Sequence, residues 1–350
     1  MPPTPEEQVQ FLLKVQRLLG EGLFSATYKY ALLMALADLS VEIGDESGSS
    51  LDIDAERIAE KFIEYYWRQT LPFLGSVVLR QNAGKPPVVV TLLLQVRNKY
   101  GDSLASAQRD SVAWRSLARQ VASNIRTMPL RYLQNVGRER IPFLYEPPQS
   151  MAQKTIRLYP GVSFCFRRFH GLIAELVQAG WTRWVRQQNL ATIGESADLH
   201  EFLFGAQRAT LMPLQKPLRE LQRNLCFYCQ KPLRQADVDH FVPWALYPLD
   251  LGHNFVLAHK ECNSAKRDLL ASEDHLNAWV DRNRSYGEDL GKECDRLGVI
   301  HNLSSTRRIA HWAYSSASTA SGLTWQTRET LVPLRGDWLT LLSENNSSVA

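Results

Sequence analysis

The sequence predicts a mostly helical α+β fold. Apolar residues such as Phe11, Val15 and Leu18 recur at helical spacing in the first third of the chain. Short runs with β-strand character follow at residues 141–145 and 155–159. A compact segment rich in cysteine and histidine then interrupts the pattern before further helices, so we expect small sheets within a helical protein.

The helical pattern is strongest where an apolar stripe follows a recognisable start. Thr4 is suited to cap a helix that begins at Pro5. We expect helices over residues 5–19, 23–43, 55–68, 105–126, 162–188, 272–297 and 304–317, with a helical lead-in over 201–225. The polar stretch 42–54 predicts a surface loop, and residues 343–350 predict a disordered tail.

These elements group into four predicted segments. Residues 1–127 form a helical domain, 128–205 a small mixed α/β unit, 206–272 the module with the cysteine cluster, and 273–350 C-terminal helices with the tail. Residues 1–205 contain no phosphate-binding loop pattern. Their role is therefore open between DNA recognition, partner binding and dimerisation.

Composition limits the functional classes. Hydrophobic residues make up 45% of the 350 residues and the formal net charge is +4, so contacts with a polyanion depend on local basic clusters. No apolar run reaches the roughly 18 residues that a membrane span needs, and the N-terminus lacks an export signal. We expect a cytoplasmic protein without a membrane partner.

Three of the five cysteines gather in one segment, which favours a metal site over disulfides. Cys226 and Cys229 form one pair with two residues between them, and His259 and Cys262 form a second. This spacing aims paired side chains at one ion and predicts a structural Cys3His site for Zn²⁺. The alternative is that the cysteines are buried apolar side chains and that His259 lies on the surface.

Polar residues of a second kind lie between and beside these pairs. They are Asp239-His240, Asn254, Asn263 and, three residues further on, Lys266. With these residues, the segment 226–270 resembles the zinc-containing branch of the HNH endonucleases, which have the ββα-metal fold. Alternating residues predict a strand that ends at Asp239-His240, a partner strand over 254–257, and a helix that begins at Asn263.

The resemblance implies a role for each residue. His240 would be the general base, because imidazole can accept a proton near neutral pH. Asp239 and Asn263 would bind a catalytic Mg²⁺ or Mn²⁺ ion. Asn254 would hold the backbone around His240 by amide hydrogen bonds, and Lys266 would contact phosphate.

Each residue also has a purely structural interpretation. His240 can be a partly buried histidine with satisfied hydrogen bonds, and Asp239 a turn residue. Asn254 can simply begin a strand, and Asn263 can be the N-cap of the following helix. We interpret His253 as a surface residue.

We therefore expect a metal-dependent HNH endonuclease that hydrolyses phosphodiester bonds of double-stranded DNA. Two alternatives remain: a non-catalytic zinc module that binds nucleic acid or a protein, and a nuclease that acts on RNA. Because one such module cuts one strand, a homodimer or a larger complex with a targeting partner is expected. Restriction of foreign DNA in antiviral defence is the context that fits such an activity.

Overall fold

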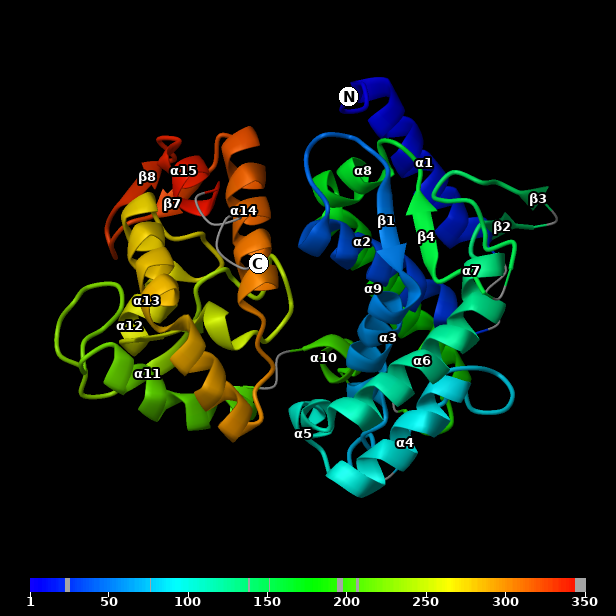
Figure 1. Ribbon diagram of the computed structural model, residues 1–350, viewed down its shortest axis with the longest axis horizontal. Coiled ribbons are helices and arrows are strands. Elements are labelled where there is room, and N and C mark those ends of the chain that lie inside the picture. The colour runs from blue at the N-terminus through cyan, green and yellow to red at the C-terminus, as the bar shows by residue number, and fades with distance from the viewer. Residues whose placement is uncertain are drawn as a thin grey trace. The chain divides into compact units, whose positions relative to one another are not determined.

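The chain divides into two compact units in the computed structural model, Met1–Gly205 (unit 1) and Ala206–Ala350 (unit 2) (Figure 1). The structure describes residues 1–22, 26–75, 77–137, 139–150, 152–193, 198–205 and 208–343. The predicted segments 1–127 and 128–205 both belong to unit 1, and the segments 206–272 and 273–350 both belong to unit 2. The fold is mostly helical with small antiparallel sheets, as an α+β protein should be.

Unit 1 is built from helices with two short strand pairs. Its helices are α1 (Pro5–Glu21), α2 (Tyr28–Ile43), α3 (Ala55–Gln69), α4 (Val88–Tyr100), α5 (Leu104–Arg109), α6 (Ser111–Thr127), α7 (Pro129–Tyr132), α8 (Val162–Arg168), α9 (His170–Gln188) and α10 (Leu199–Phe204). Its strands are β1 (Leu51–Asp54), β2 (Asn135–Val136), β3 (Glu139–Arg140) and β4 (Thr155–Leu158). The antiparallel pairs are β1 with β4 and β2 with β3.

Unit 2 alternates short strands with helices. Its helical elements are the 3-10 helix η1 (Arg208–Leu214), α11 (Gln215–Leu221), the 3-10 helix η2 (Gly252–Asn254), α12 (Lys260–Lys266), α13 (Glu273–Leu297), α14 (Leu303–Thr319) and α15 (Asp337–Ser343). Its strands are β5 (Asp237–His240), β6 (Phe255–Ala258), β7 (Leu323–Trp325) and β8 (Leu331–Pro333). The antiparallel pairs are β5 with β6 and β7 with β8. No described helix combines the length and the apolar character that crossing a membrane requires.

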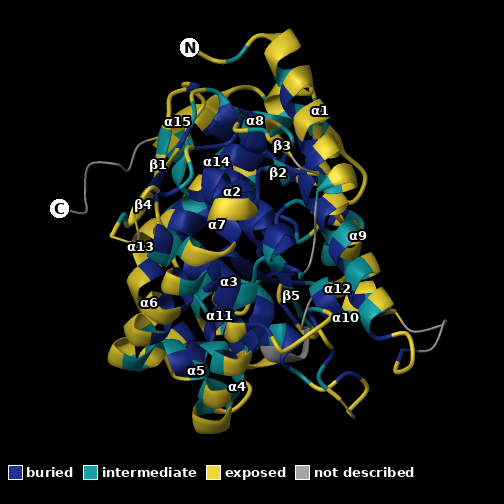
Figure 2. Cartoon of the chain, turned by 90° about the vertical axis from the view of Figure 1, so that its right-hand side faces the viewer, coloured by how far each residue is buried: buried dark blue, intermediate teal, exposed yellow. Residues whose placement is uncertain are grey.

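Helix α2 forms the centre of unit 1. All but two of its residues are buried, and it packs against α3, α8 and α9. Helix α1 is different: only Phe11, Val15 and Leu18 are buried, and Figure 2 shows its outer side exposed. The apolar core continues from α1 through Ile156 and Trp181, so the two predicted segments of unit 1 share one core.

Unit 1 also buries an ionic cluster between α2 and α3. The Lys61 ammonium lies 2.5 Å from Glu42 and 3.0 Å from Glu64. Burial alone would lower the pKa of Lys61, but the two carboxylates raise it above its usual value. The lysine therefore stays charged in the core, where it compensates two acids.

A second set of buried polar contacts joins α2 to α3, α8 and α9. The Asp38 carboxylate accepts a hydrogen bond from Tyr65 at 2.6 Å and lies 2.7 Å from Nε2 of His170. Arg167 donates to the carbonyl oxygens of Ser40 and Val41 at the end of α2. A guanidinium at a helix C-terminus satisfies carbonyl groups that have no partner within the helix. The middle of unit 1 is therefore fixed by buried charges as well as by apolar packing.

The structure confirms several predicted helices of unit 1 and corrects others. Thr4 caps α1 through a capping box with Glu7, as the sequence predicts for the helix start. The helix predicted from residue 23 begins at Tyr28, and residues 23–25 lie outside the described residues. The predicted helix 105–126 is interrupted at Asp110, which caps α6, and the predicted helix 162–188 is interrupted at Phe169.

Two other predictions for unit 1 are wrong. Residues 51–54 of the predicted loop form β1, because Leu51 and Ile53 pair with Leu158 and Ile156 of β4. Residues 141–145 do not form a regular strand, although residues 155–158 do. The partners of β1 are about a hundred residues away in the chain, and local patterns do not reveal such a pairing.

The small sheet of unit 2 is anchored on the long helix α13. Arg282 is buried and donates hydrogen bonds to the carbonyl oxygens of Phe255 and, at 2.6 Å, His253. The Trp279 ring stacks on Phe241 with their centroids 4.9 Å apart. Helix α13 thereby fixes both the strand β6 and the segment that follows β5.

Unit 2 differs from the prediction at the start of α12 and at its C-terminal end. The helix begins at Lys260 and not at Asn263, because His259 takes the N-cap position directly after β6. The hairpin of β7 and β8 and the helix α15 have no counterpart in the predicted elements. Helices α13 and α14 agree with the predicted helices 272–297 and 304–317. Of the predicted tail, residues 344–350 lie outside the described residues.

Candidate functional site

Four predicted metal ligands converge in unit 2. The Sγ atoms of Cys226, Cys229 and Cys262 and a ring nitrogen of His259 all lie within 4.8 Å of one another. Three thiols and one imidazole are a donor set that Zn²⁺ takes in tetrahedral sites. The cluster can therefore hold a structural metal ion such as zinc, with His259 in the fourth position.

Local backbone geometry brings the first cysteine pair together. The Gln230 N–H donates to the Cys226 carbonyl at 3.0 Å, and the Cys226 N–H donates to the Lys231 carbonyl at 2.9 Å. Gln230 adopts a left-handed φ of 56°, which closes this tight turn. The Phe227 N–H bonds to the Leu257 carbonyl at 3.0 Å, so the turn is attached to β6.

The second pair is positioned by the start of α12. Nδ1 of His259 lies 3.3 Å from Sγ of Cys229, while its Nε2 lies 3.1 Å from the Pro232 carbonyl oxygen. Because a carbonyl oxygen only accepts, Nε2 carries the proton in this contact and Nδ1 presents its lone pair to the cluster. Cys262 follows in the first turn of the helix.

The thiols of the cluster titrate unequally. Burial alone would raise the pKa of Cys229, but hydrogen bonds from the Lys231 backbone and from the neighbouring ligands lower it to about 7. For Cys262, burial is the main effect and the pKa is raised to about 11. The charges of Cys226 and Cys229 add to the rise in the pKa of Cys262, and a bound cation would offset this repulsion between the sulfurs.

The β7–β8 turn supplies a residue that the sequence did not point to. Arg328 lies with Nη2 3.5 Å from Sγ of Cys262 and 3.7 Å from Glu261. The residues of this turn line a cavity of about 410 Å³ together with Cys229 and His259. A positive group beside three thiolates would offset part of their charge.

The predicted base His240 ends strand β5 and is about seven-eighths buried. Its Nε2 lies 2.7 Å from Oδ1 of Asp250. Because a carboxylate accepts, Nε2–H is the donor and Nδ1 holds the lone pair. The ring packs edge-on against Phe255 at 4.9 Å and Trp244 at 5.4 Å between centroids. Its orientation is therefore fixed from three sides.

Asn254 fixes the backbone directly after His240. Its Oδ1 accepts from the Val242 N–H at 2.8 Å, and its Nδ2 donates to the Val242 carbonyl at 2.9 Å. The Asn254 carbonyl also accepts from the Phe241 N–H at 2.9 Å. This buried amide acts on the backbone, and a catalytic contribution from it stays a prediction.

Asp239 of β5 and Lys266 of α12 form a buried pair. Oδ2 of Asp239 accepts from the Tyr228 hydroxyl at 2.5 Å and lies 3.2 Å from the Lys266 ammonium. Lys266 is fully buried and donates to the His240 carbonyl at 2.9 Å. Its ammonium group neutralises Asp239 inside the module. Lys266 is therefore not on the surface, where a contact with phosphate would form.

This pairing bears on the predicted Mg²⁺ ligands. Asp239 and Asn263 are the expected metal ligands, but Oδ2 of Asp239 already contacts the Tyr228 hydroxyl and the Lys266 ammonium. A divalent cation on that oxygen would meet the like charge of Lys266. Asp239 and Asn263 as ligands of a catalytic Mg²⁺ or Mn²⁺ ion remain predictions.

The structure excludes the structural alternative for Asn263 and corrects the prediction for His253. Asn263 lies inside α12 and is not its N-cap, because His259 holds that place. His253, interpreted as a surface residue, is buried with Nε2 3.0 Å from the Gly287 carbonyl. Burial lowers the pKa of His253 to about 4, so this imidazole is neutral in the folded protein.

Comparison with known proteins gives a match for one part of the chain. No curated protein and no solved structure matches it. Residues 9–203 match the family described as Domain of unknown function (DUF8808). This match lies within unit 1 and spans more than half of the 350 residues. The chain therefore belongs to the DUF8808 family.

Proposed function

We propose that unit 2 is a zinc-stabilised HNH-type endonuclease module that hydrolyses phosphodiester bonds of DNA. The observation that carries the proposal is the His240–Asp250 pair at the end of β5. There an imidazole with a defined tautomer ends one strand of an antiparallel pair whose second strand leads into α12. The order of two strands and a helix, stapled by a Cys3His cluster, is compatible with the resemblance of residues 226–270.

The chemistry follows from the hydrogen bonds of His240. Nδ1 can take a proton from a water molecule that attacks phosphorus, while Asp250 stabilises the imidazolium that forms. The bond from phosphorus to the departing sugar oxygen breaks in the same step, and that oxygen takes a proton from solvent. Asn254 holds the backbone at Val242, two residues after His240. Asp250 is a positioning residue in this proposal, since it acts through His240.

The test is cleavage of supercoiled plasmid by the full-length protein with added Mg²⁺ or Mn²⁺. We expect His240→Ala to reduce the nicking rate by about a hundredfold or more, the contribution of a general base. His200→Ala, which removes an exposed histidine of unit 1, is the matched control and should cut at the wild-type rate. Equal rates for wild type and His240→Ala would refute the assignment.

Asp250 has a more specific readout. We expect Asp250→Asn to lower the rate by at least about tenfold and to shift the pH–rate profile, because the neutral amide stabilises imidazolium less than a carboxylate does. Asp250→Glu should recover part of the rate. A slower enzyme with an unchanged pH profile would indicate that Asp250 serves folding only. Structured RNA in parallel reactions separates DNA from RNA cleavage.

The Lys266–Asp239 pair favours a second candidate function. If Asp239 always pairs with Lys266, unit 2 is a zinc module that binds nucleic acid or a protein without cutting it. That alternative predicts that His240→Ala retains binding, and that neither it nor the wild type nicks plasmid with any divalent metal. Cleavage by the wild type but not by His240→Ala would eliminate this alternative.

A further inference from the structure

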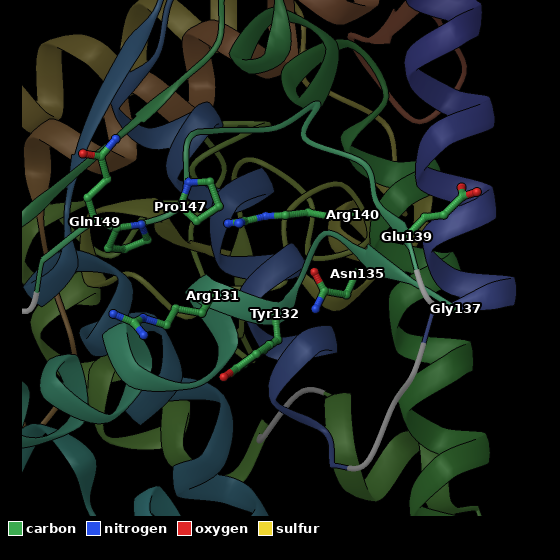
Figure 3. Close-up of a pocket in the computed structure, with 9 residues that line it drawn as sticks. Arg131, Tyr132, Asn135, Gly137, Glu139, Arg140, Pro147 and Gln149 are labelled. Atoms are coloured by element: carbon green, nitrogen blue, oxygen red, sulfur yellow. The ribbon is translucent and has the colours of Figure 1, made fainter.

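A cavity of about 510 Å³ lies in unit 1, where α7, the β2–β3 hairpin and residues 147–149 meet (Figure 3). Its volume is within the range of small-molecule sites. None of its lining residues belongs to the metal cluster or the His240 site. It lies within the part of the chain that matches DUF8808.

The cavity has an excess of positive charge. Arg131 on α7 and Arg140 on β3 both line it and are exposed, and neither has an ion-pair partner among the described residues. The acid in the lining, Glu139, lies 3.5 Å from Arg17 of α1 and points away from the two arginines in Figure 3. Two guanidinium groups without carboxylate partners favour an anion, and their planar donors match phosphate.

The uncharged part of the lining suits an aromatic ring with polar edges. The Tyr132 ring is about half exposed beside Arg131, and Pro147 and Pro148 form a rigid apolar wall. Asn135 and Gln149 each offer an amide NH2 group that donates and a carbonyl oxygen that accepts. Aromatic rings stack on nucleobases, and amides pair with their edges.

We propose that this cavity binds a nucleotide, with Arg131 and Arg140 holding its phosphate and Tyr132 stacking on its base. The nucleotide is either free or part of a nucleic-acid strand, because both present the same phosphate and base. The proposal does not rest on nuclease activity, since it concerns unit 1 alone. It gives the DUF8808 region a role in ligand recognition.

Binding to the full-length His240→Ala protein tests the proposal without cleavage. Fluorescence anisotropy would follow a labelled single-stranded oligodeoxynucleotide, and calorimetry would follow a free deoxynucleoside monophosphate. We expect Arg131→Ala with Arg140→Ala to weaken binding by at least about tenfold and to lower the salt dependence by about one to two phosphate contacts. Tyr132→Ala should weaken binding, whereas Tyr132→Phe should retain it.

The control is Arg115→Ala with Arg119→Ala, which removes the same charge from α6 and should change affinity little. Thermal melting verifies that each variant is folded. Binding of the oligonucleotide but not of the monophosphate would identify a strand as the ligand, and binding of both would identify the nucleotide itself. The proposal is overturned if neither probe binds, or if the two double variants bind equally well.

Discussion

Both units bury ion pairs among apolar side chains, but among the described residues only unit 2 adds a cluster of metal ligands. Unit 1 has a large apolar core, the buried ion pair of Lys61 with Glu42 between neighbouring helices, and the contact of His170 with Asp38, which links distant parts of the sequence. Unit 2 gathers four metal ligands from within a short stretch of chain beside a two-stranded sheet. The difference predicts that removing a metal ion should affect unit 2 alone, and that removing a buried charge of unit 1 should leave the metal cluster intact.

The largest expected effect comes from the metal cluster. Cys226→Ser should release about one zinc ion per chain and unfold unit 2, because a structural site contributes roughly 10 kcal/mol or more to folding. Native mass spectrometry measures the zinc content, and unit 1 should melt as in the wild type. Cys294→Ala, which removes a buried cysteine outside the cluster, is the control and should keep its zinc. Full zinc content in Cys226→Ser would contradict the Cys3His site.

A buried charge of unit 1 gives the next effect. Lys61→Met leaves Glu42 and Glu64 without their shared counter-ion and should lower the free energy of unfolding of unit 1 by about 3–5 kcal/mol. Denaturant unfolding with zinc content measured in parallel checks both units. Lys85→Met, at an exposed lysine, should change stability by less than about 0.5 kcal/mol. Loss of zinc from Lys61→Met would show that the stability of unit 2 depends on unit 1.

The smallest expected effect is the pH dependence of stability that the buried His253 gives to unit 2, separate from metal binding. The folded pKa of His253 is about 4, against about 6.5 in an unfolded chain. Between these values the unfolded chain binds a proton that the folded protein does not, so stability falls as pH decreases from 6.5 to 4. At pH 5 this protonation costs the wild type about 2 kcal/mol of its free energy of unfolding, and His253→Gln should not show that loss. If wild type and variant lose stability equally between pH 7 and pH 5, the burial of His253 has no such effect.

The metal ligands could be predicted because their information is local. The pairs Cys226/Cys229 and His259/Cys262 each have two intervening residues, a spacing at which a tight turn or the first turn of a helix can aim both side chains at one point. The start of helix α1 could be predicted for the same reason, since Thr4 and Glu7 form its cap within one turn. Such features need no knowledge of the rest of the fold.

Contacts between distant residues could not be predicted in this way. Asp250 follows β5 in an irregular segment without a pattern, and only the folded chain brings its carboxylate to His240. Lys266 was predicted to contact phosphate, and its burial was missed because a short motif does not say which side of a helix faces the core. The pairing of β1 with β4 and the pocket around Arg131 likewise depend on how the folded chain brings separate segments together.

The anchoring of β6 by Arg282 has a practical consequence for dissecting this protein. A fragment that stopped at residue 272 would lack α13 and would leave the carbonyl oxygens of Phe255 and His253 without their guanidinium partner. It would also expose the face of Phe241 that Trp279 covers. Expression fragments that retain the strands around His240 should therefore extend beyond Leu297 to include the rest of unit 2, and the boundary between residues 205 and 206 is the cut that spares both units.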